Sequence, residues 1–356
     1  MKRNHLPHYS DHKWPSPLLL LVASALFLLL IFTLTLGHGR YSDSSSAGDF
    51  YTAELDLRGD GNARLGLPKL PRLAYMVSGS RGDGSRLRRI LQAVYHPRNY
   101  YLLHLDLEAS DDERLELAKF LKSEESVIGE FGNVMVVGKA NLVTPKGPTM
   151  IASTLHAVAI LLKKASDWDW FINLSASDYP LMPQDGSSWV MLSKPFLEFC
   201  VWGWDNLPRT LLMYYTNFLS STEGYFHTVA CNHRDYQNTT VNHDLRYIRW
   251  DNPPKQHPIS LTLEHFNDMV LSGTPFAHTF AKDDPVLDKI DKELLRRPRH
   301  HFTPGGWCVG KPGSHKDPCL LHGNPNLVKP TLNSKRLEKL IVKLLDNENF
   351  RVKQCK

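Results

Sequence analysis

From residue 72 onward, apolar segments with the character of strands alternate with amphipathic segments, and this alternation constrains the fold more than any other feature. In the segment RLRRILQAVYH, Leu87, Ile90 and Leu91 recur at helical spacing. Residues 149–164 form another amphipathic segment, whose final lysines suit the end of a helix. Such alternation predicts an α/β fold with a largely parallel sheet. The predicted strands are RLAYMVSGS (72–80), YYLLHLDLE (100–108), VMVVGKA (134–140) and WFINLSA (170–176).

The segment after the second predicted strand begins with a recognisable helix start. Ser110 is followed three residues later by Glu113, which is the pattern of a capping box. In a capping box each of the two side chains bonds to the backbone N–H of the other residue. We therefore predict a helix from this serine through Leu121.

The N-terminal part of the chain contains a long apolar segment. Residues 17–36 carry no charge, and at ~1.5 Å per residue they span a ~30 Å hydrocarbon core. Lys2, Arg3 and Lys13 precede this segment, so the positive-inside rule places the N-terminus in the cytosol. A cleaved signal peptide is the alternative, but the apolar segment is long and no A-x-A-like site follows it. We predict a cytosolic tail (1–16), a transmembrane signal anchor (17–36), a stem (37–71) and a lumenal domain (72–356).

A lumenal domain meets conditions that allow disulfides and glycosylation. None of the five cysteines forms a C-x-x-C motif, which disfavours zinc, and an odd number leaves at least one free or paired between chains. Cys308 and Cys319 bracket a loop rich in glycine and proline and are the best local pair. Asn238 is a plausible glycosylation site, whereas Asn173 matches the same pattern inside an apolar strand. The net charge of +5 has no dense basic run, which argues against a nucleic-acid partner.

Polar residues follow three of the predicted strands. They are Ser78 to Ser80 after the first strand, Asp106 at the end of the second, and Ser177 with Asp178 after the fourth. Each could be an ordinary loop or cap residue. Ligands of parallel sheets bind beyond the carboxyl ends of the strands, so three such groups at one edge favour a nucleotide-type site.

The same edge offers a poor metal site. Asp167 and Asp169 form an Asp-x-Asp triplet, but the triplet precedes its strand and so lies at the amino edge of the sheet, as a turn. Asp178 stands alone at the carboxyl edge, and one carboxylate binds Mg²⁺ or Mn²⁺ poorly. We therefore expect no metal cofactor, and a leaving diphosphate would need lysine or arginine.

Long motifs of this chain resemble a known family. LAYMVSGS, DWDWFINLSASDYPL, WGWDNLPRT, EGYFHTV and RYIRWDNPPKQHP are similar to segments of plant β-glucuronosyltransferases of glycosyltransferase family 14. These are relatives of the core-2/I-branching N-acetylglucosaminyltransferases and the xylosyltransferases. The resemblance implies a GT-A-type fold, an inverting reaction, a UDP-sugar donor, no metal, and residence in the Golgi membrane. For the plant branch it implies transfer from UDP-glucuronic acid to galactan chains of arabinogalactan proteins.

The resemblance also implies roles for individual residues. Glu223 falls on the family's catalytic base, although an exposed turn glutamate is the plain alternative. Trp250 matches an aromatic residue on the acceptor side, where an indole can face a sugar. Thr279 stands where relatives carry a lysine for the diphosphate, in Phe-Ala-His-Thr-Phe instead of F-A-R-K-F. The implied donor-binding residues are Val77, Asp106 and Asp178, with Lys255 and Lys282 as possible replacements for the lysine.

The sequence departs from the family between Asp178 and Phe196. In relatives, several dozen residues separate the D-Y-P-L turn from the G-S-x-W-x-x-L-S-[RK]-P-F segment, and they include acceptor-binding residues and central strands. Here Asp185 is followed directly by Gly186. We infer an in-frame loss near 185–186, which leaves the activity of this chain open.

Two other functions fit the same sequence. An N-acetylglucosaminyl- or xylosyltransferase would share the fold and differ in the donor sugar. A non-catalytic Golgi protein would keep the folded surface and bind other Golgi transferases. The glutamate at position 223 favours an enzyme ancestor, whereas the gap and Thr279 favour lost activity.

Overall fold

The computed structural model describes residues 70–355 except 139, 145–146, 184–191, 219–220, 242, 312–315, 329–330 and 353. Every described residue belongs to one compact unit, the second of two into which the chain divides, Asp56–Lys356. The predicted tail, anchor and nearly all of the stem therefore lie outside the described residues, and so does the junction at 185–186. Among the residues that are described, no helix is long and apolar enough to cross a bilayer.

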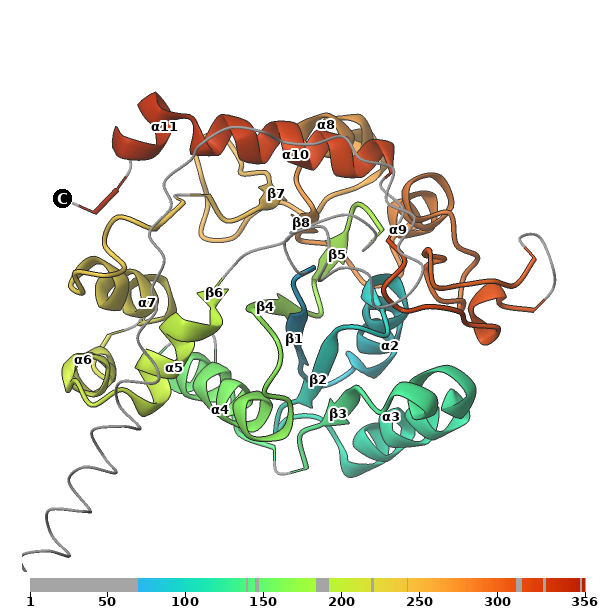
Figure 1. Ribbon diagram of the computed structural model, residues 1–356, viewed down its shortest axis with the longest axis horizontal. Coiled ribbons are helices and arrows are strands. Elements are labelled where there is room, and N and C mark those ends of the chain that lie inside the picture. The colour runs from blue at the N-terminus through green and yellow to red at the C-terminus, as the bar shows by residue number, and fades with distance from the viewer. Residues whose placement is uncertain are drawn as a thin grey trace, which may run out of the picture. The chain divides into compact units, whose positions relative to one another are not determined.

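A mixed sheet of five strands forms the centre of the second unit (Figure 1). Its order is β3-β2-β1-β4-β6, in which the first four strands run parallel and β6 is antiparallel to β4. The parallel α/β arrangement predicted from the sequence is confirmed. The strands are β1 (Leu73–Gly79), β2 (Tyr100–Leu105), β3 (Val134–Val136), β4 (Trp170–Ser175) and β6 (Leu192–Ser193).

Helices cover both faces of this sheet because successive side chains of a strand point to opposite faces. Tyr75 and Val77 of β1 belong to the core on the face that also contains Leu87 of α2 and Leu117 of α3. Met76 belongs to the opposite core, which is built against α4. These helices span Gly84–Val94 (α2), Asp111–Ser123 (α3) and Thr149–Lys164 (α4), and a π-helical turn, Glu125–Gly129, follows α3.

The capping box predicted at the start of α3 is only half formed. The Ser110 side chain accepts a hydrogen bond from the backbone N–H of Glu113 at 3.2 Å, as expected. The Glu113 carboxylate does not return to Ser110 and instead accepts from the backbone N–H groups of Gly82 (3.1 Å) and Gly84 (2.8 Å). The carboxylate therefore joins α3 to the loop before α2, where two N–H groups at a helix start compete successfully for it.

A second sheet of three strands lies beyond the first, in the order β5-β8-β7. β5 (Asp178–Pro180) is antiparallel to β8 (Phe276–His278), which is parallel to β7 (Arg246–Ile248). These strands have three residues each and lie far apart in the sequence, so they carry no periodic signal. The remaining α-helices are α5 (Lys194–Trp202), α6 (Leu207–Tyr215), α7 (Ser221–Cys231), α8 (Phe266–Ser272), α9 (Pro285–Ile290), α10 (Leu332–Leu345) and α11 (Asn347–Val352). Short helical turns lie at Leu263–His265, Asp291–Leu295 and Pro318–Leu320.

Two disulfides lie within the described residues. One joins Cys308 to Cys319, the pair favoured by sequence, with their Cα atoms 4.4 Å apart. The other joins Cys231 at the end of α7 to Cys355, 124 residues later. Cys200 is a buried free thiol, and burial raises its pKa to about 12, so it is a poor nucleophile.

Candidate functional site

Asp178 begins β5, directly after the carboxyl end of β4, and only 4% of it is exposed. One carboxylate oxygen accepts from the backbone N–H (2.7 Å) and hydroxyl (3.0 Å) of Ser175. The other accepts from Arg246 Nε at 3.2 Å and bonds to His278 Nδ1 at 3.1 Å. The sequence placed Asp178 alone at this edge, whereas the structure surrounds its carboxylate with partners.

The charge state of Asp178 follows from these contacts. Burial alone would raise its pKa, because a carboxylate loses hydration in the interior. The positive charge of Arg246 and the bonds from His278 and Ser175 outweigh burial, and the pKa is lowered. Asp178 is therefore ionised at neutral pH.

Arg246 and Asp178 bond to backbone groups near the carboxyl end of β4, on the edge of the strand that faces away from β1. β6 pairs only with Trp170 and Phe171, at the beginning of β4. Further along, the Asn173 carbonyl accepts from Arg246 Nη2 at 2.5 Å, and the Ser175 N–H donates to Asp178. Two polar side chains thus satisfy backbone groups that an adjoining strand would otherwise bond.

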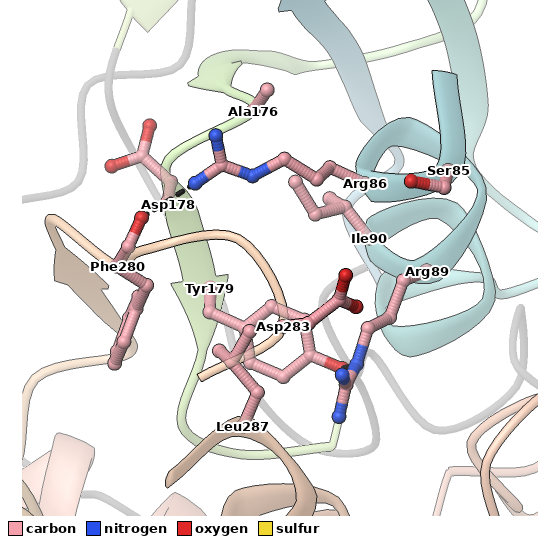
Figure 2. Close-up of a pocket in the computed structure, with 10 residues that line it drawn as sticks. All are labelled: Ser85, Arg86, Arg89, Ile90, Ala176, Asp178, Tyr179, Phe280, Asp283 and Leu287. Carbon is pink, nitrogen blue, oxygen red and sulfur yellow. Dashed lines mark hydrogen bonds between the residues drawn. The ribbon is translucent and has the colours of Figure 1, made fainter. Parts of the chain in front are cut away.

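A pocket of about 340 Å³, including its open mouth, lies beside this edge between α2, β5 and the start of α9 (Figure 2). The Arg86 guanidinium extends from α2 toward Asp178 and donates to the carbonyl oxygen of Phe280. Arg86 also pairs with Asp83 at 3.1 Å. The Arg86 guanidinium therefore lies beside the residue that follows Thr279. It is lined by Ser85, Arg86, Arg89, Ile90, Ala176, Asp178, Tyr179, Phe280, Asp283 and Leu287.

A buried polar network supports one wall of the pocket. The Tyr179 hydroxyl donates to Asp291 at 2.6 Å and accepts from Arg297 at 2.7 Å. Arg89, which lines the pocket, bonds to the same aspartate at 2.7 Å. Burial raises the pKa of the tyrosine to about 12, which the nearby arginines only partly oppose. The D-Y-P-L turn is thereby fixed to α2 and to the turn after α9.

Asp106 directly follows β2, which β1 separates from β4, and it is also buried. Its backbone N–H donates to the carbonyl of Gly79 at 3.0 Å, and its carboxylate accepts from the N–H of Glu108 at 3.0 Å. Desolvation raises its pKa. The ends of β1 and β2 therefore adjoin, as the sequence predicted. The loop amides at the start of α2 are occupied by Glu113, so they do not form an open phosphate cradle.

The three other residues assigned to donor binding lie in three different parts of the fold. Val77 is fully buried within β1, between β2 and β4, and its side chain belongs to the core. Lys282 is exposed and donates to the carbonyl of Gly82 at 3.1 Å, which brings it to the loop after β1. Lys255 is exposed in the loop after β7 and pairs with Asp251 at 3.0 Å. Of these two lysines, Lys282 lies on the same edge of the sheet as the pocket.

Glu223 occupies the first turn of α7 and is exposed. Among the described residues its carboxylate accepts no hydrogen bond, and its backbone carbonyl bonds to His227 at 3.0 Å. The adjoining Gly224 lets Tyr215 approach, since a Cβ there would lie 2.4 Å from the tyrosine hydroxyl. No residue of α7 lines the pocket of Figure 2, so the structure does not bring Glu223 and Asp178 together in one cavity.

The remaining sequence assignments are surface or structural positions. Trp250 is 47% exposed after β7, and Asn238 is exposed in a turn after α7. Asp167 pairs with Arg72 at 2.6 Å, and Asp169 accepts from the same residue's N–H at 2.8 Å. The Asp-x-Asp triplet thus joins the amino end of the sheet, as predicted. Sequence analysis missed Arg86, Arg246 and His278, because their partners lie far away in the chain.

Comparison with known proteins identifies the class. The sequence model of the Core-2/I-Branching enzyme family matches residues 73–185 and 183–270. Beta-glucuronosyltransferase GlcAT14C of Arabidopsis thaliana is 49% identical over 420 residues, covering 100% of both chains. GlcAT14A of the same plant is 45% identical, covering 98% of this chain and 94% of its own. Xylosyltransferase 1 of Homo sapiens is 22% identical over 51% of this chain and 24% of its own.

The fold, the motifs and these relatives define a glycosyltransferase. The chain belongs to the Core-2/I-Branching enzyme family. The family match divides at 183–185, and the alignment with GlcAT14C is longer than the 356 residues of this chain. The chain is therefore shorter than its relatives, consistent with the loss inferred at the junction.

Proposed function

We propose that this protein is an inverting glucuronosyltransferase with a GT-A-type fold. It would transfer glucuronic acid from UDP-glucuronic acid to galactan chains of arabinogalactan proteins. The observation that carries the proposal is its 49% identity, over the full length of both chains, to a β-glucuronosyltransferase. The 22% identity to xylosyltransferase 1 covers only half of the chain, which makes xylose a weaker choice of donor sugar.

We assign the donor to the carboxyl edge of the parallel sheet, near Asp106 and the pocket beside Asp178. The Val77 side chain is buried, so it cannot contact the donor. Backbone groups near Val77 could contact the nucleotide base of the donor only where β1 ends. Lys282, and Arg86 beside its partner Asp83, are cations on this edge that can oppose the diphosphate charge in place of the family lysine. Lys255 is a less favourable candidate because its ion pair is with Asp251 in the loop after β7, not with the strand-end loops beside the pocket.

Glu223 is assigned as the general base. Its carboxylate would take the proton from the acceptor hydroxyl as that oxygen attacks the anomeric carbon and UDP departs from the opposite face. Its exposure and its lack of a hydrogen-bond partner among the described residues leave the carboxylate available to an acceptor. Trp250, half exposed after β7, is assigned to the acceptor side, where its indole can pack on a sugar.

We further propose that transfer needs no divalent metal. The Asp178 carboxylate is already bonded to Ser175, Arg246 and His278, and a metal would have to displace them. Asp167 and Asp169 are engaged by Arg72 at the opposite edge. Activity should therefore survive EDTA, and activity lost in EDTA but restored by Mn²⁺ would contradict this assignment.

For its cellular setting we propose a single-pass type II protein of the Golgi membrane. The support is the uncharged segment 17–36 and the basic residues before it. In sealed microsomes, protease added outside should leave the large domain intact. Digestion of that domain without detergent would overturn the topology.

The donor assay tests the central proposal. The purified full chain is incubated with a galactan oligosaccharide and, in parallel, UDP-glucuronic acid, UDP-N-acetylglucosamine or UDP-xylose, and products are analysed by mass. A product carrying glucuronic acid is expected. A preference for either other sugar would select the neighbouring activity, and UDP binding without any transfer would favour a non-catalytic Golgi protein.

A further inference from the structure

Two contacts fasten the first turn of α7, which carries the proposed base, to the end of α6. The buried Ser221 hydroxyl shares its proton between the carbonyl oxygens of Tyr215 (2.7 Å) and Phe218 (2.6 Å). The Tyr215 ring lies against the backbone of Gly224, and its hydroxyl bonds to the Thr228 hydroxyl at 2.8 Å. Positions 221, 224 and 228 are three and four residues apart, so these contacts lie along one face of α7.

The ring approaches α7 this closely because position 224 is glycine. A Cβ on Gly224 would lie 2.8 Å from two ring carbons of Tyr215, which is closer than carbon atoms pack. The ring also packs against the core that contains Tyr225 and Val229 of the same helix, so it has little room to move aside. A side chain at position 224 would therefore push the first turn of α7 away from α6.

Glu223 depends on this packing for its position. Glu223 and His227 are both exposed and lie four residues apart, on a different face of α7 from the one that contacts Tyr215. Within the part of the chain that the structure describes, no side chain bonds to the Glu223 carboxylate. The backbone of the first turn therefore sets where the carboxylate lies. A general base must come within ~2.6–3.2 Å of the proton's oxygen, so a shift of ~1 Å would take it out of reach.

We propose that Tyr215 is a positioning residue for the base. It fixes the first turn of α7 through Ser221 and Gly224, and it acts on the reaction only through the placement of Glu223. The inference rests on the proposed function, which supplies the role of the glutamate. A tyrosine that served only the core would, when replaced, lower stability without a selective effect on the base.

A double-mutant cycle tests the inference. Transfer from UDP-glucuronic acid to galactobiose is measured for the full chain, Tyr215→Leu, Glu223→Gln and the double variant. Tyr215→Leu should lower kcat about tenfold through misplacement of the base, with UDP binding unchanged. With Glu223→Gln already present, Tyr215→Leu should cause no further loss, because no base remains to be misplaced. Tyr236→Leu is the control, since this ring packs on Phe196 and Phe199 in the same core, and it should keep kcat.

Amide hydrogen exchange of residues 221–228 is measured in the same proteins and does not require activity. Exchange there should be faster in Tyr215→Leu than in Tyr236→Leu, and unchanged exchange would overturn the inference. An equal loss of kcat in both glutamate backgrounds would overturn it too, as would an equal loss in the two leucine variants. Full transfer by Glu223→Gln would instead contradict the base assigned in the proposed function. If the wild type transfers nothing, the proposed activity of this chain fails, and hydrogen exchange alone decides whether Tyr215 fixes the turn.

Discussion

The guanidinium of Arg246 lies 3.2 Å from the carboxylate of Asp178 and also donates to the carbonyl of Asn173. This pair connects β7 to the carboxyl end of β4 across 68 residues of sequence. It lies beside the pocket assigned to the donor, so the stability of the fold and the shape of the site depend on the same contact.

Arg246→Ala should lower the free energy of unfolding by about 3 kcal/mol, because it leaves a buried carboxylate without its charged partner. Urea unfolding of the two proteins measures this. Arg249→Ala is the matched control, since its pair with Asp268 is about half exposed and solvent screening should leave it with little effect on the free energy of unfolding. Equal effects of the two substitutions would show that the first pair has no special structural role.

Acid should remove the stabilisation provided by Asp178. Its pKa is lowered in the folded state from an ordinary value of 3.8, so its contribution is complete above that value and is lost as pH falls through the lowered pKa. The difference in unfolding free energy between wild type and Asp178→Asn should be largest near neutral pH and shrink below pH 3.8. A difference that stays constant into strong acid would contradict the assigned charge state.

The disulfide between Cys231 and Cys355 should stabilise the domain more than the one between Cys308 and Cys319. The first closes a loop of 124 residues and the second a loop of 11, and longer loops restrict the unfolded chain more. Replacing the first pair with serines should cost about 2–4 kcal/mol. The serine variant of the second pair provides the comparison, and a larger loss there would reverse the expected order.

Restoring the missing segment at 185–186 should increase glycosyl transfer more than it increases UDP binding. Val77, Asp106 and Asp178 all precede the junction, whereas Glu223 follows it. The segment of GlcAT14C is inserted, and both proteins are assayed side by side. Equal transfer rates would show that residues 185–188 form a natural tight loop and that no functional segment is missing.

Sequence periodicity predicted β1 to β4 of the central sheet, because each lies in an apolar segment and these segments alternate with amphipathic helices. α4 was predicted with the bounds that the structure shows, residues 149–164. β5, β6, β7 and β8 were not predicted, since two or three residues outside a longer apolar segment contain too little pattern to distinguish a strand from a loop. Glu113 shows a second limit: its position correctly marked a helix start, but its carboxylate found better partners in a distant loop.

The candidate site was predictable only in part. The polar residue at the end of each strand could be located, because strand ends follow directly from the periodic pattern. The partners of Asp178 could not be predicted from the sequence, since Arg246 lies 68 residues and His278 lies 100 residues away along the chain. The role assigned to Glu223 came from a family motif, because an exposed glutamate in a first helical turn has no distinguishing local pattern.

Replacement of the proposed base tests the account most directly. In the chain with the segment restored, Glu223→Gln should lower glucuronosyl transfer by at least ~100-fold, the low end for losing a general base. UDP binding should remain unchanged, because the base acts on the acceptor. Glu264→Gln, at another exposed glutamate in a first helical turn, should retain full transfer. Near-normal transfer by Glu223→Gln would contradict the assignment of the base.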